Sequence, residues 1–260
     1  MRESGDSPAG GLAGCAVVEM RRYLLRPGGF DDLRRLFQRW LVDGQEQAGM
    51  RLGGQFRDRD NPDRFVWFRG FESMVQRHEA LEAFYLGPVW RTHRDAANAT
   101  MIDSDDVLLL RPTDPAHPPT DPVSLGGPGT TASTTWAVAQ VWSWTTGDDP
   151  ESTLAGLGHE VLRQRLGVPV AMWRTEPSPN TFPWLPVRDG RHVVWLAVFP
   201  DAEHWLDAAT RLARDERWRR ITGRLAAAGA TDELLHLQPT ATSRHPRPAG
   251  GPAGWQDIAP

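Results

Sequence analysis

Two stretches of this chain follow one plan, and this internal repeat constrains the fold more than any other feature. The first stretch, Arg64 to Trp90, contains an apolar run with a central tryptophan, a short acidic turn, and an amphipathic helix that reaches a second tryptophan. The second stretch, Arg191 to Trp218, repeats this order. Trp67 and Trp195 are 128 residues apart, and the two closing tryptophans have the same spacing. Similarity at a fixed spacing indicates that one structural unit occurs twice.

The elements around the repeat predict two copies of β-α-β-β-α-β, which is the ferredoxin-like plan. In the first half we expect strands at 16–25, 52–58, 65–71 and 107–111, with helices at 30–46 and 72–98, the second interrupted near Gly87 and Pro88. In the second half we expect strands at 136–144, 168–175, 192–199 and 234–238, with helices at 151–166 and 201–229.

A four-stranded sheet with helices on one face leaves its other face bare, and an apolar bare face must find a partner. The predicted strands carry large apolar groups in both registers, so two sheets from one chain can meet face to face. We therefore predict an α+β fold in which two tandem ferredoxin-like repeats form an intrachain pseudo-dimeric α/β barrel.

Composition places the domain boundaries. Residues 1–14 are expected to be a disordered leader, 15–112 the first domain, 113–134 a Pro/Gly-rich linker, 135–239 a second, diverged domain, and 240–260 a disordered tail.

Charge and cysteine content exclude several classes. The net charge of −4 argues against a nucleic-acid surface, which needs a clustered positive field. Cys15 is the only cysteine, so no internal disulfide or thiolate metal site can form. No stretch has the length of a signal peptide core or a membrane span, so we expect a cytoplasmic protein without membrane contact. All 29 basic residues are arginine, a bias that suggests a GC-rich bacterial genome.

Polar residues line one face of the first predicted strand. Alternation places Glu19, Arg21 and Tyr23 on the same side, as candidate catalytic residues. Arginines on neighbouring strands are candidate substrate-binding residues, namely Arg57, Arg69 and Arg111. Together these groups could hold an anionic or enolate-like substrate, with Glu19 or Tyr23 exchanging a proton. Alternatively, Glu19 pairs with an arginine in a buried structural network, or the face meets water.

Tryptophans are concentrated in the second half. They could wall a pocket for a flat apolar molecule, or pack in the core between sheets. The substrate-binding candidates of this group are Trp67, Gln140, Trp142, Trp144 and Trp173, with Trp195 beside them.

The runs VVEMRRYLLRPGGFDDL, GGQFRDR, FVWFRGFESMVQRHEAL and GPVW resemble the NIPSNAP family of the dimeric α/β-barrel superfamily. The resemblance covers about residues 15 to 112 well and 136 to 239 loosely. The family's first-strand Glu, Arg and Tyr match Glu19, Arg21 and Tyr23. Its usual His and Trp in the third strand fall at Trp67 and Arg69 here. In the second half, Gln140, Trp142 and Trp144 stand at the Glu, Arg and Tyr positions.

Two histidines remain as candidates. Either His93 on the second helix or His159 could be a general base, or a haem ligand as the superfamily resemblance implies for some members. The alternative for both is a surface or satisfied core residue. The sequence has no HExxH, HxH, CxxC or dinucleotide motif. We expect no metal and no cofactor.

Three functions stay open at this point. The resemblance implies a cofactor-independent monooxygenase, cyclase or isomerase acting on an aromatic or polyketide-like intermediate of bacterial secondary metabolism. A non-catalytic small-molecule-binding or scaffolding protein is the first alternative, and a haem-dependent enzyme is the second. The expected partner is an aromatic or anionic small molecule. The expected state is a monomer with an internal pseudo-dimer, and a homodimer stays open.

Overall fold

A computed structural model describes the chain at residues 11–114, 134–145 and 150–240. Most of the expected leader, linker and tail lies outside these residues. Two described residues at the expected boundaries are packed into the fold. Leu12 is buried in the central core, and the backbone nitrogen of Thr240 donates to the carbonyl oxygen of Gln55 at 2.8 Å. Leu12 of the expected leader and Thr240 of the expected tail are therefore part of the packed fold.

The first half contains the expected strands and helices in the expected order. Its elements are β1 (Val17–Leu25), α1 (Phe30–Leu36), the π-helical turn η1 (Phe37–Leu41), α2 (Val42–Gln47), β2 (Arg51–Asp58), β3 (Arg64–Phe71), α3 (Met74–Tyr85), α4 (Pro88–Ala99), β4 (Met101–Asp103) and β5 (Val107–Pro112). Ser73 caps α3 by accepting from the backbone nitrogen of Gln76, and Pro88 begins α4. The predicted helix break is confirmed. The short strand β4 was not predicted, because three residues carry no periodic signal.

The second half follows the same order. Its elements are β6 (Trp136–Trp144), α5 (Pro150–Thr153), the π-helical turn η3 (Leu154–Gly158), α6 (His159–Leu166), β7 (Val170–Thr175), β8 (Arg191–Phe199), α7 (Ala202–Arg214), α8 (Glu216–Ala227) and β9 (Thr231–Pro239). The prediction of one helix over 201–229 is wrong, because Asp215 leaves the helical conformation. Its carboxylate accepts from the backbone nitrogens of Arg217 and Trp218 and so begins α8.

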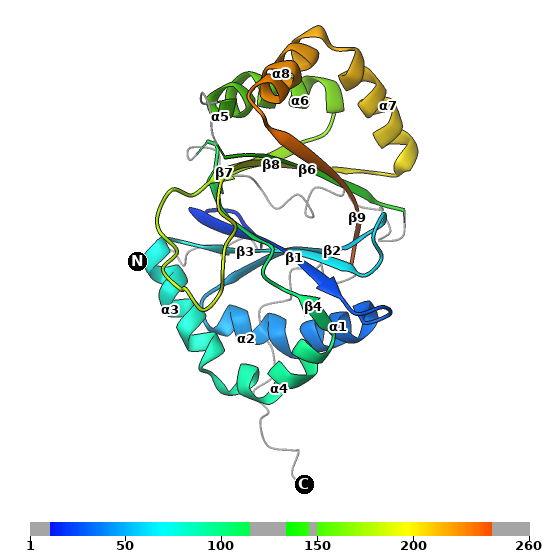
Figure 1. The fold of residues 1–260 in the computed structure, drawn as a ribbon. Coiled ribbons are helices and arrows are strands. Elements are labelled where there is room, and N and C mark those ends of the chain that lie inside the picture. The colour runs from blue at the N-terminus through cyan, green and yellow to red at the C-terminus, as the bar shows by residue number, and fades with distance from the viewer. Residues whose placement is uncertain (1–10, 115–133, 146–149, 241–260) are drawn as a thin grey trace, which may run out of the picture.

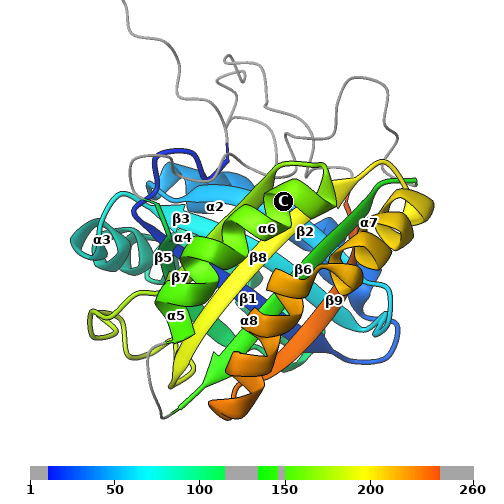
Figure 2. The ribbon, with the colours of Figure 1, turned by 90° about the horizontal axis from the view of Figure 1, so that it is seen from above.

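Eight antiparallel strands close into a barrel. The strand order is β3-β2-β9-β6-β8-β7-β5-β1, the pairing of β1 with β3 closes the circle, and β4 extends from β1. The two halves meet at two seams, where β2 pairs with β9 and β5 pairs with β7. Helices α1 to α4 cover one side of the barrel and α5 to α8 cover the opposite side (Figures 1 and 2). The expected α/β barrel is therefore confirmed as a closed barrel of strands with helices on its outside (Figure 1).

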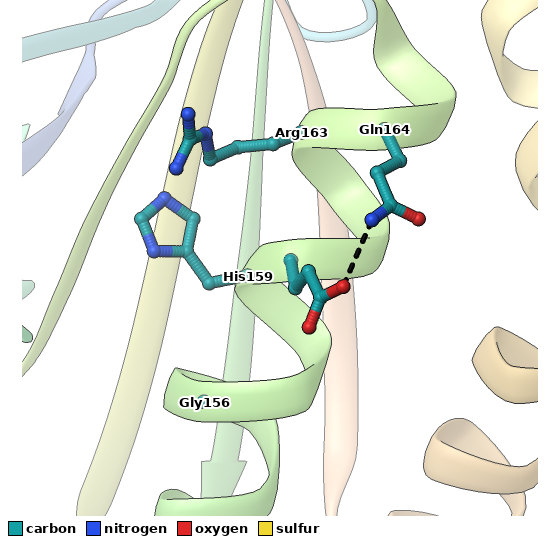
Figure 3. Close-up of a pocket in the computed structure, with 5 residues that line it drawn as sticks. Gly156, His159, Arg163 and Gln164 are labelled. Carbon is teal, nitrogen blue, oxygen red and sulfur yellow. Dashed lines mark hydrogen bonds between the residues drawn. The ribbon is translucent and has the colours of Figure 1, made fainter.

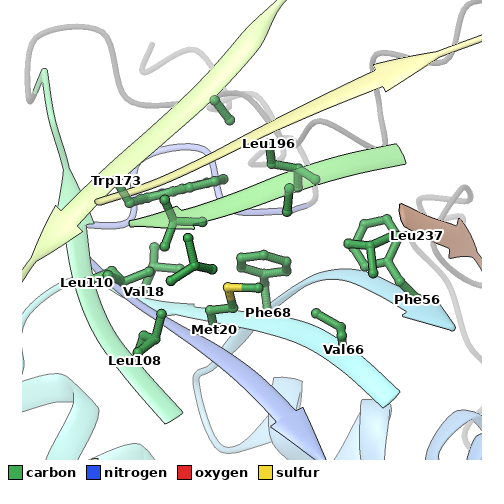
Figure 4. Packing of buried hydrophobic residues seen from close by; sticks show 14 of the residues in the cluster. Val18, Met20, Phe56, Val66, Phe68, Leu108, Leu110, Trp173, Leu196 and Leu237 are labelled. Carbon is green, nitrogen blue, oxygen red and sulfur yellow. The ribbon is translucent and has the colours of Figure 1, made fainter. Parts of the chain in front are cut away.

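The barrel interior is a single apolar core to which both halves contribute (Figure 4). Phe68 of the first half stacks on Trp173 of the second, with ring centroids 5.6 Å apart. Strand alternation sends Val18 and Met20 into this core and turns the intervening residues of β1 toward the helices. Both faces of each sheet are therefore buried, as the apolar residues in both registers predicted. Among the described residues, no helix is long and apolar enough to cross a membrane.

Candidate functional site

A buried charged cluster lies between β1 and the helices of the first half. The Glu19 carboxylate accepts from three guanidinium groups, those of Arg21 at 2.8 Å, Arg69 at 2.7 Å and Arg77 at 2.7 Å. Arg21 and Arg69 bind one carboxylate oxygen and Arg77 binds the other. All four side chains are almost completely excluded from solvent. Two of the three expected residues of β1, Glu19 and Arg21, therefore meet one of the expected arginines, Arg69.

Local structure explains why these groups converge. Glu19 lies directly opposite Arg69 in the antiparallel pairing of β1 and β3, and Arg21 lies opposite Trp67. Arg77 comes from α3, where it shares the buried face with Ala80, Leu81 and Phe84. An arginine thus occupies a position of the helix that faces the sheet.

A second ring of polar groups holds the arginines. Arg69 donates to the Gln45 side-chain oxygen at 3.1 Å. Arg77 donates through Nη1 to the side-chain oxygens of Asn180 at 3.0 Å and Thr181 at 3.3 Å. These last two residues belong to the loop between β7 and β8, so the second half of the chain completes a site in the first half.

The cluster carries more positive than negative charge. Arginine does not lose its proton in proteins, so three guanidinium cations face one carboxylate. Burial alone would raise the pKa of Glu19, but Arg69, Arg21 and Arg77 outweigh burial and hold that pKa far below its usual range. Among the described residues, Glu19 is the only carboxylate paired with these arginines. The cluster is therefore an environment that favours a further anion.

An aromatic cavity adjoins the cluster. Its volume is about 30 Å³, roughly enough for one or two water molecules. Its walls are mainly aromatic and apolar, and comprise Tyr23, Leu33, Phe37, Leu41, Gln45, Trp67, Phe84, Tyr85, Trp90, Ala97 and Met101. The guanidinium groups of Arg21 and Arg69 lie over Trp67, at 5.7 Å and 5.4 Å from its ring.

Tyr23 connects the cavity with the charged cluster. Its hydroxyl oxygen accepts from Nε of Arg21 at 2.9 Å, which leaves its own hydrogen for another acceptor. Burial raises the pKa of Tyr23, and this effect exceeds the lowering by Arg21. The phenol is therefore protonated at neutral pH and can act as a hydrogen-bond donor toward the cavity.

Three predicted residues of the first half lie away from the cluster. Arg57 packs over the Phe30 ring and donates to the carbonyl oxygen of Pro62. Arg111 stands at the seam opposite Arg174 of β7. His93 stacks on Trp40, with ring centroids 4.8 Å apart. The structure does not bring these three to Glu19.

The predicted residues of the second half occupy two other places. Trp142 and Trp144 are buried in the apolar core between the second sheet and its helices, whereas Trp173 lies inside the barrel. Gln140 accepts from the indole nitrogen of Trp195 at 2.9 Å and donates to Asp232 at 2.7 Å. These residues do not form one pocket with Glu19.

The cross-strand register corrects the expected alignment of the halves. Arg21 pairs with Trp67 in the first half, and Gln140 pairs with Trp195 in the second. With Trp67 matched to Trp195, the residues of β6 that correspond to Glu19, Arg21 and Tyr23 are Val138, Gln140 and Trp142. The expected assignment of Gln140, Trp142 and Trp144 to these positions is wrong by two residues. A shift of two keeps the same face of a strand, so periodicity could not detect it.

His159 is the first residue of α6 and lies beside a surface depression of about 420 Å³. His159 and Arg163 point to one side of the helix and Gln164 to the other (Figure 3). Nε2 of His159 lies 3.2 Å from the carbonyl oxygen of Val170, which occupies the nitrogen that a haem iron would need. His93 stacks on Trp40, and the cavity of about 30 Å³ beside its helix is far too small for a porphyrin. Among the described residues, no three His, Cys, Asp or Glu side chains gather to bind a metal ion.

Several residues of the site were missed in the sequence. Arg77 had a usable signal in the sequence. It shares one helical face with Ala80, Leu81 and Phe84, so a charged residue interrupts an otherwise apolar, core-facing stripe. Tyr85 and Gln45 gave no such signal, and neither did Asn180 and Thr181. The loop residues approach Arg77 only through the packing of the two halves.

Comparisons with known proteins identify the fold. No protein-family model matches the chain, and no curated protein matches its sequence. A proposed monooxygenase from Lactobacillus acidophilus matches 86% of this chain and 93% of its own, with a TM-score of 0.52 and 8% identity. A proposed monooxygenase from Fusobacterium nucleatum matches 88% of this chain and 94% of its own, also with a TM-score of 0.52 and 8% identity.

A NIPSNAP domain protein from Burkholderia xenovorans matches 37% of this chain and 93% of its own, with a TM-score of 0.35 and 18% identity. The structural neighbours thus include NIPSNAP proteins and monooxygenase-like barrels, the two groups that the resemblance in the sequence led us to expect. The chain therefore has the dimeric α/β-barrel fold, with the whole barrel formed by one chain.

Proposed function

We propose that this protein is a small-molecule enzyme of the monooxygenase type, with its site between β1 and the helices of the first half. Its substrate is an aromatic molecule that carries or develops a negative charge. The observation that supports this proposal is the buried excess of positive charge, three arginines against Glu19, beside a cavity with aromatic walls. A fold at this level of identity supports the class only by analogy.

The residues of the cluster have different roles in this proposal. Tyr23 donates a hydrogen bond to the substrate oxygen, and Arg21 supports the negative charge on that oxygen as an enolate or phenolate forms. Glu19 is not the proton carrier considered from the sequence, because three guanidinium groups keep it ionised. Instead it positions the arginines. Trp67 supplies a flat apolar wall for the substrate ring.

We further propose that the reaction needs no metal or nucleotide cofactor, and that the substrate is a polyketide-like intermediate of bacterial secondary metabolism in the cytoplasm. We also propose that the halves are tandem ferredoxin-like repeats, in the domains 15–112 and 135–239. Their shared element order and the matched pairs Arg21–Trp67 and Gln140–Trp195 support this origin.

The test combines binding with turnover. Aromatic acids and polyketide-like phenols are screened by thermal shift, and compounds that bind are assayed for oxygen consumption and product. Tyr23→Phe removes one hydroxyl group, and we expect it to lower kcat about 10²-fold, the usual effect of losing one oxyanion donor. Trp218→Phe, a buried change in the second half, is the matched control and should keep full activity. Full activity in Tyr23→Phe contradicts the proposal.

A second candidate is a non-catalytic small-molecule-binding protein. It is favoured by the complete pairing of Glu19 with arginines, which leaves no described base in contact with the cavity. Specific binding that depends on Arg21, without turnover of any bound compound under aerobic conditions, would select this candidate.

A further inference from the structure

One segment of the second half enters the first half. The loop between β7 and β8 spans residues 176–190 and descends past the lower sheet to α3 (Figure 1). The corresponding connection between β2 and β3 is a short turn over residues 59–63. Thr181 bonds α3 twice, through its hydroxyl to the carbonyl of Met74 and through its own carbonyl to His78. The long loop is thus anchored on the helix that carries Arg77.

Arg77 is incompletely paired. Its Nε binds Glu19, and its Nη1 donates to two neutral oxygens, those of Asn180 and Thr181. Its Nη2 is buried and has no hydrogen-bond acceptor among the described residues. A guanidinium group offers two parallel donors that match a carboxylate, and such charged pairs are stronger than bonds to neutral oxygens. The loop therefore presents Arg77 with a weaker substitute for an anion.

Phe182 follows directly, and its aromatic ring packs against His78 and Tyr85 of the same helix, α3. Its side chain is 5% exposed and belongs to the core of the first half. It stacks on Tyr85, with centroids 6.0 Å apart and an interplanar angle of 29°. Tyr85 also forms a wall of the aromatic cavity. The Phe182 ring and the cavity thus lie against the same tyrosine.

We propose that the ligand of this site is an arylcarboxylate and that the segment Asn180–Phe182 occupies its place in the free protein. This inference rests on the proposed site in the first half. The carboxylate binds Nη1 and Nη2 of Arg77 in place of the Asn180 and Thr181 oxygens, and the aromatic ring replaces Phe182 against Tyr85. The incoming negative charge offsets part of the excess positive charge around Glu19. Displacement of the segment also provides room for an organic molecule, which the cavity of about 30 Å³ on its own does not.

The experiment uses the full chain and two probes, 2-naphthoate and its neutral analogue 2-naphthamide, with affinities measured by calorimetry. In Phe182→Ala the competing ring is gone, and we expect naphthoate to bind about tenfold more tightly than to the unaltered protein. Naphthamide should bind more weakly to both. Leu206→Ala changes an exposed side chain on α7 of the second half, 63% accessible, and should leave the affinity unchanged.

A second pair of variants tests the anion and covers the case in which Phe182→Ala does not fold. Thr181→Val keeps the shape but removes one acceptor of Arg77, and we expect naphthoate affinity to rise about twofold to threefold. Arg77→Met should abolish the preference for naphthoate over naphthamide. In the unaltered protein, naphthoate should increase the amide hydrogen exchange of residues 176–190, because the segment is displaced.

Each other outcome contradicts a defined part of the inference. Equal gains for both probes in Phe182→Ala indicate a plain apolar cavity and overturn the carboxylate assignment. Equal naphthoate affinity in the unaltered protein, Phe182→Ala and Thr181→Val shows that the segment does not compete, while the proposed site itself stands. If neither naphthoate nor any phenol of the wider screen binds any variant, the proposed function fails together with this inference.

Discussion

The two halves of the barrel use one backbone plan to bury opposite kinds of side chain. At three matched helix-facing positions the first half has Glu19, Arg69 and Arg77, and the second has Val138, Ala197 and Trp205. Trp205 packs against Trp195 and Phe199 within an apolar cluster. Because apolar packing satisfies the same geometry, the fold does not require the charged cluster. Buried charges are costly to retain, and this contrast between the halves is one reason why we propose a site in the first half.

The largest difference between the halves should appear when the Glu19 charge is removed. Glu19→Gln leaves three buried guanidinium groups without their anion, and we expect a loss of about 3–5 kcal/mol in the free energy of unfolding. Denaturant unfolding measures this loss. The matched change Val138→Ala removes only two methyl groups and should cost about 2 kcal/mol. Equal costs at the two positions would contradict a special role for the charge.

A smaller difference concerns the barrel interior near the N-terminal residues. Gly70 corresponds to Val198 of the second half, yet a β-carbon at Gly70 would lie 2.4 Å from Sγ of Cys15. Gly70→Ala should therefore destabilise the protein by about 1–3 kcal/mol through overpacking. Cys15→Gly in the same chain should restore part of the loss, and an additive result in this double mutant would show that Cys15 is not the obstacle.

Acid should affect the second half before the first. Burial, and then Arg188, lower the pKa of His192 in the second half from 6.5 to about 4. The stability that depends on neutral His192 is present above pH 6.5 and is lost as the pH falls toward 4, by at most about 2 kcal/mol between pH 7 and 5. The pKa of Glu19 is depressed, so its contribution is present above pH 4.5 and is lost only at lower pH. Denaturant unfolding at several pH values measures this loss of stability between pH 7 and 5. The loss should disappear in His192→Gln. It should persist in Glu19→Gln, provided that this variant folds.

The smallest effect is expected at Arg77, although its side chain is completely buried. Arg77→Met leaves Glu19 paired with Arg21 and Arg69 and removes one uncompensated charge. Its cost should stay at about 1–2 kcal/mol, because one buried oxygen of Glu19 loses its donor while the excess positive charge of the cluster becomes smaller. Chemical denaturation provides the measurement. A loss as large as that of Glu19→Gln would mean that Arg77 serves the fold rather than a ligand.

Much of the fold was predictable because its signals are local. Alternation along β1 placed Glu19, Arg21 and Tyr23 on one face, and the repeated tryptophan and helix pattern predicted two matched halves. Turn and cap residues predicted the break before α4. The break at Asp215 was missed because a capping aspartate inside an amphipathic pattern is hard to distinguish from a surface residue of one long helix.

The candidate site was predictable only in part. Glu19 and Arg69 lie on strands that a ferredoxin-like order makes neighbours, so their meeting followed from the plan. Arg57 and Arg111 share the same sheet but stand at other positions along it, which a strand order alone does not reveal. Trp173 and Trp142 were both candidates for the walls of one pocket. The alternation of side chains along β7 instead turns Trp173 into the barrel, whereas Trp142 faces the helices. Residue type suggested these candidates, and the register decided between them.

The sequence by itself determined the order of the elements, its recurrence in the second half, and the face on which each strand residue lies, because each depends on periodicity along a few neighbouring residues. Only the tertiary structure decided the pairing of Glu19 with Arg77, 58 residues away, and of Arg77 with Asn180, 103 residues further on. Such contacts depend on how helices and loops of separate units pack against a sheet. The resulting balance of charge around Glu19 is a property of that packing, and no local pattern in the chain encodes it.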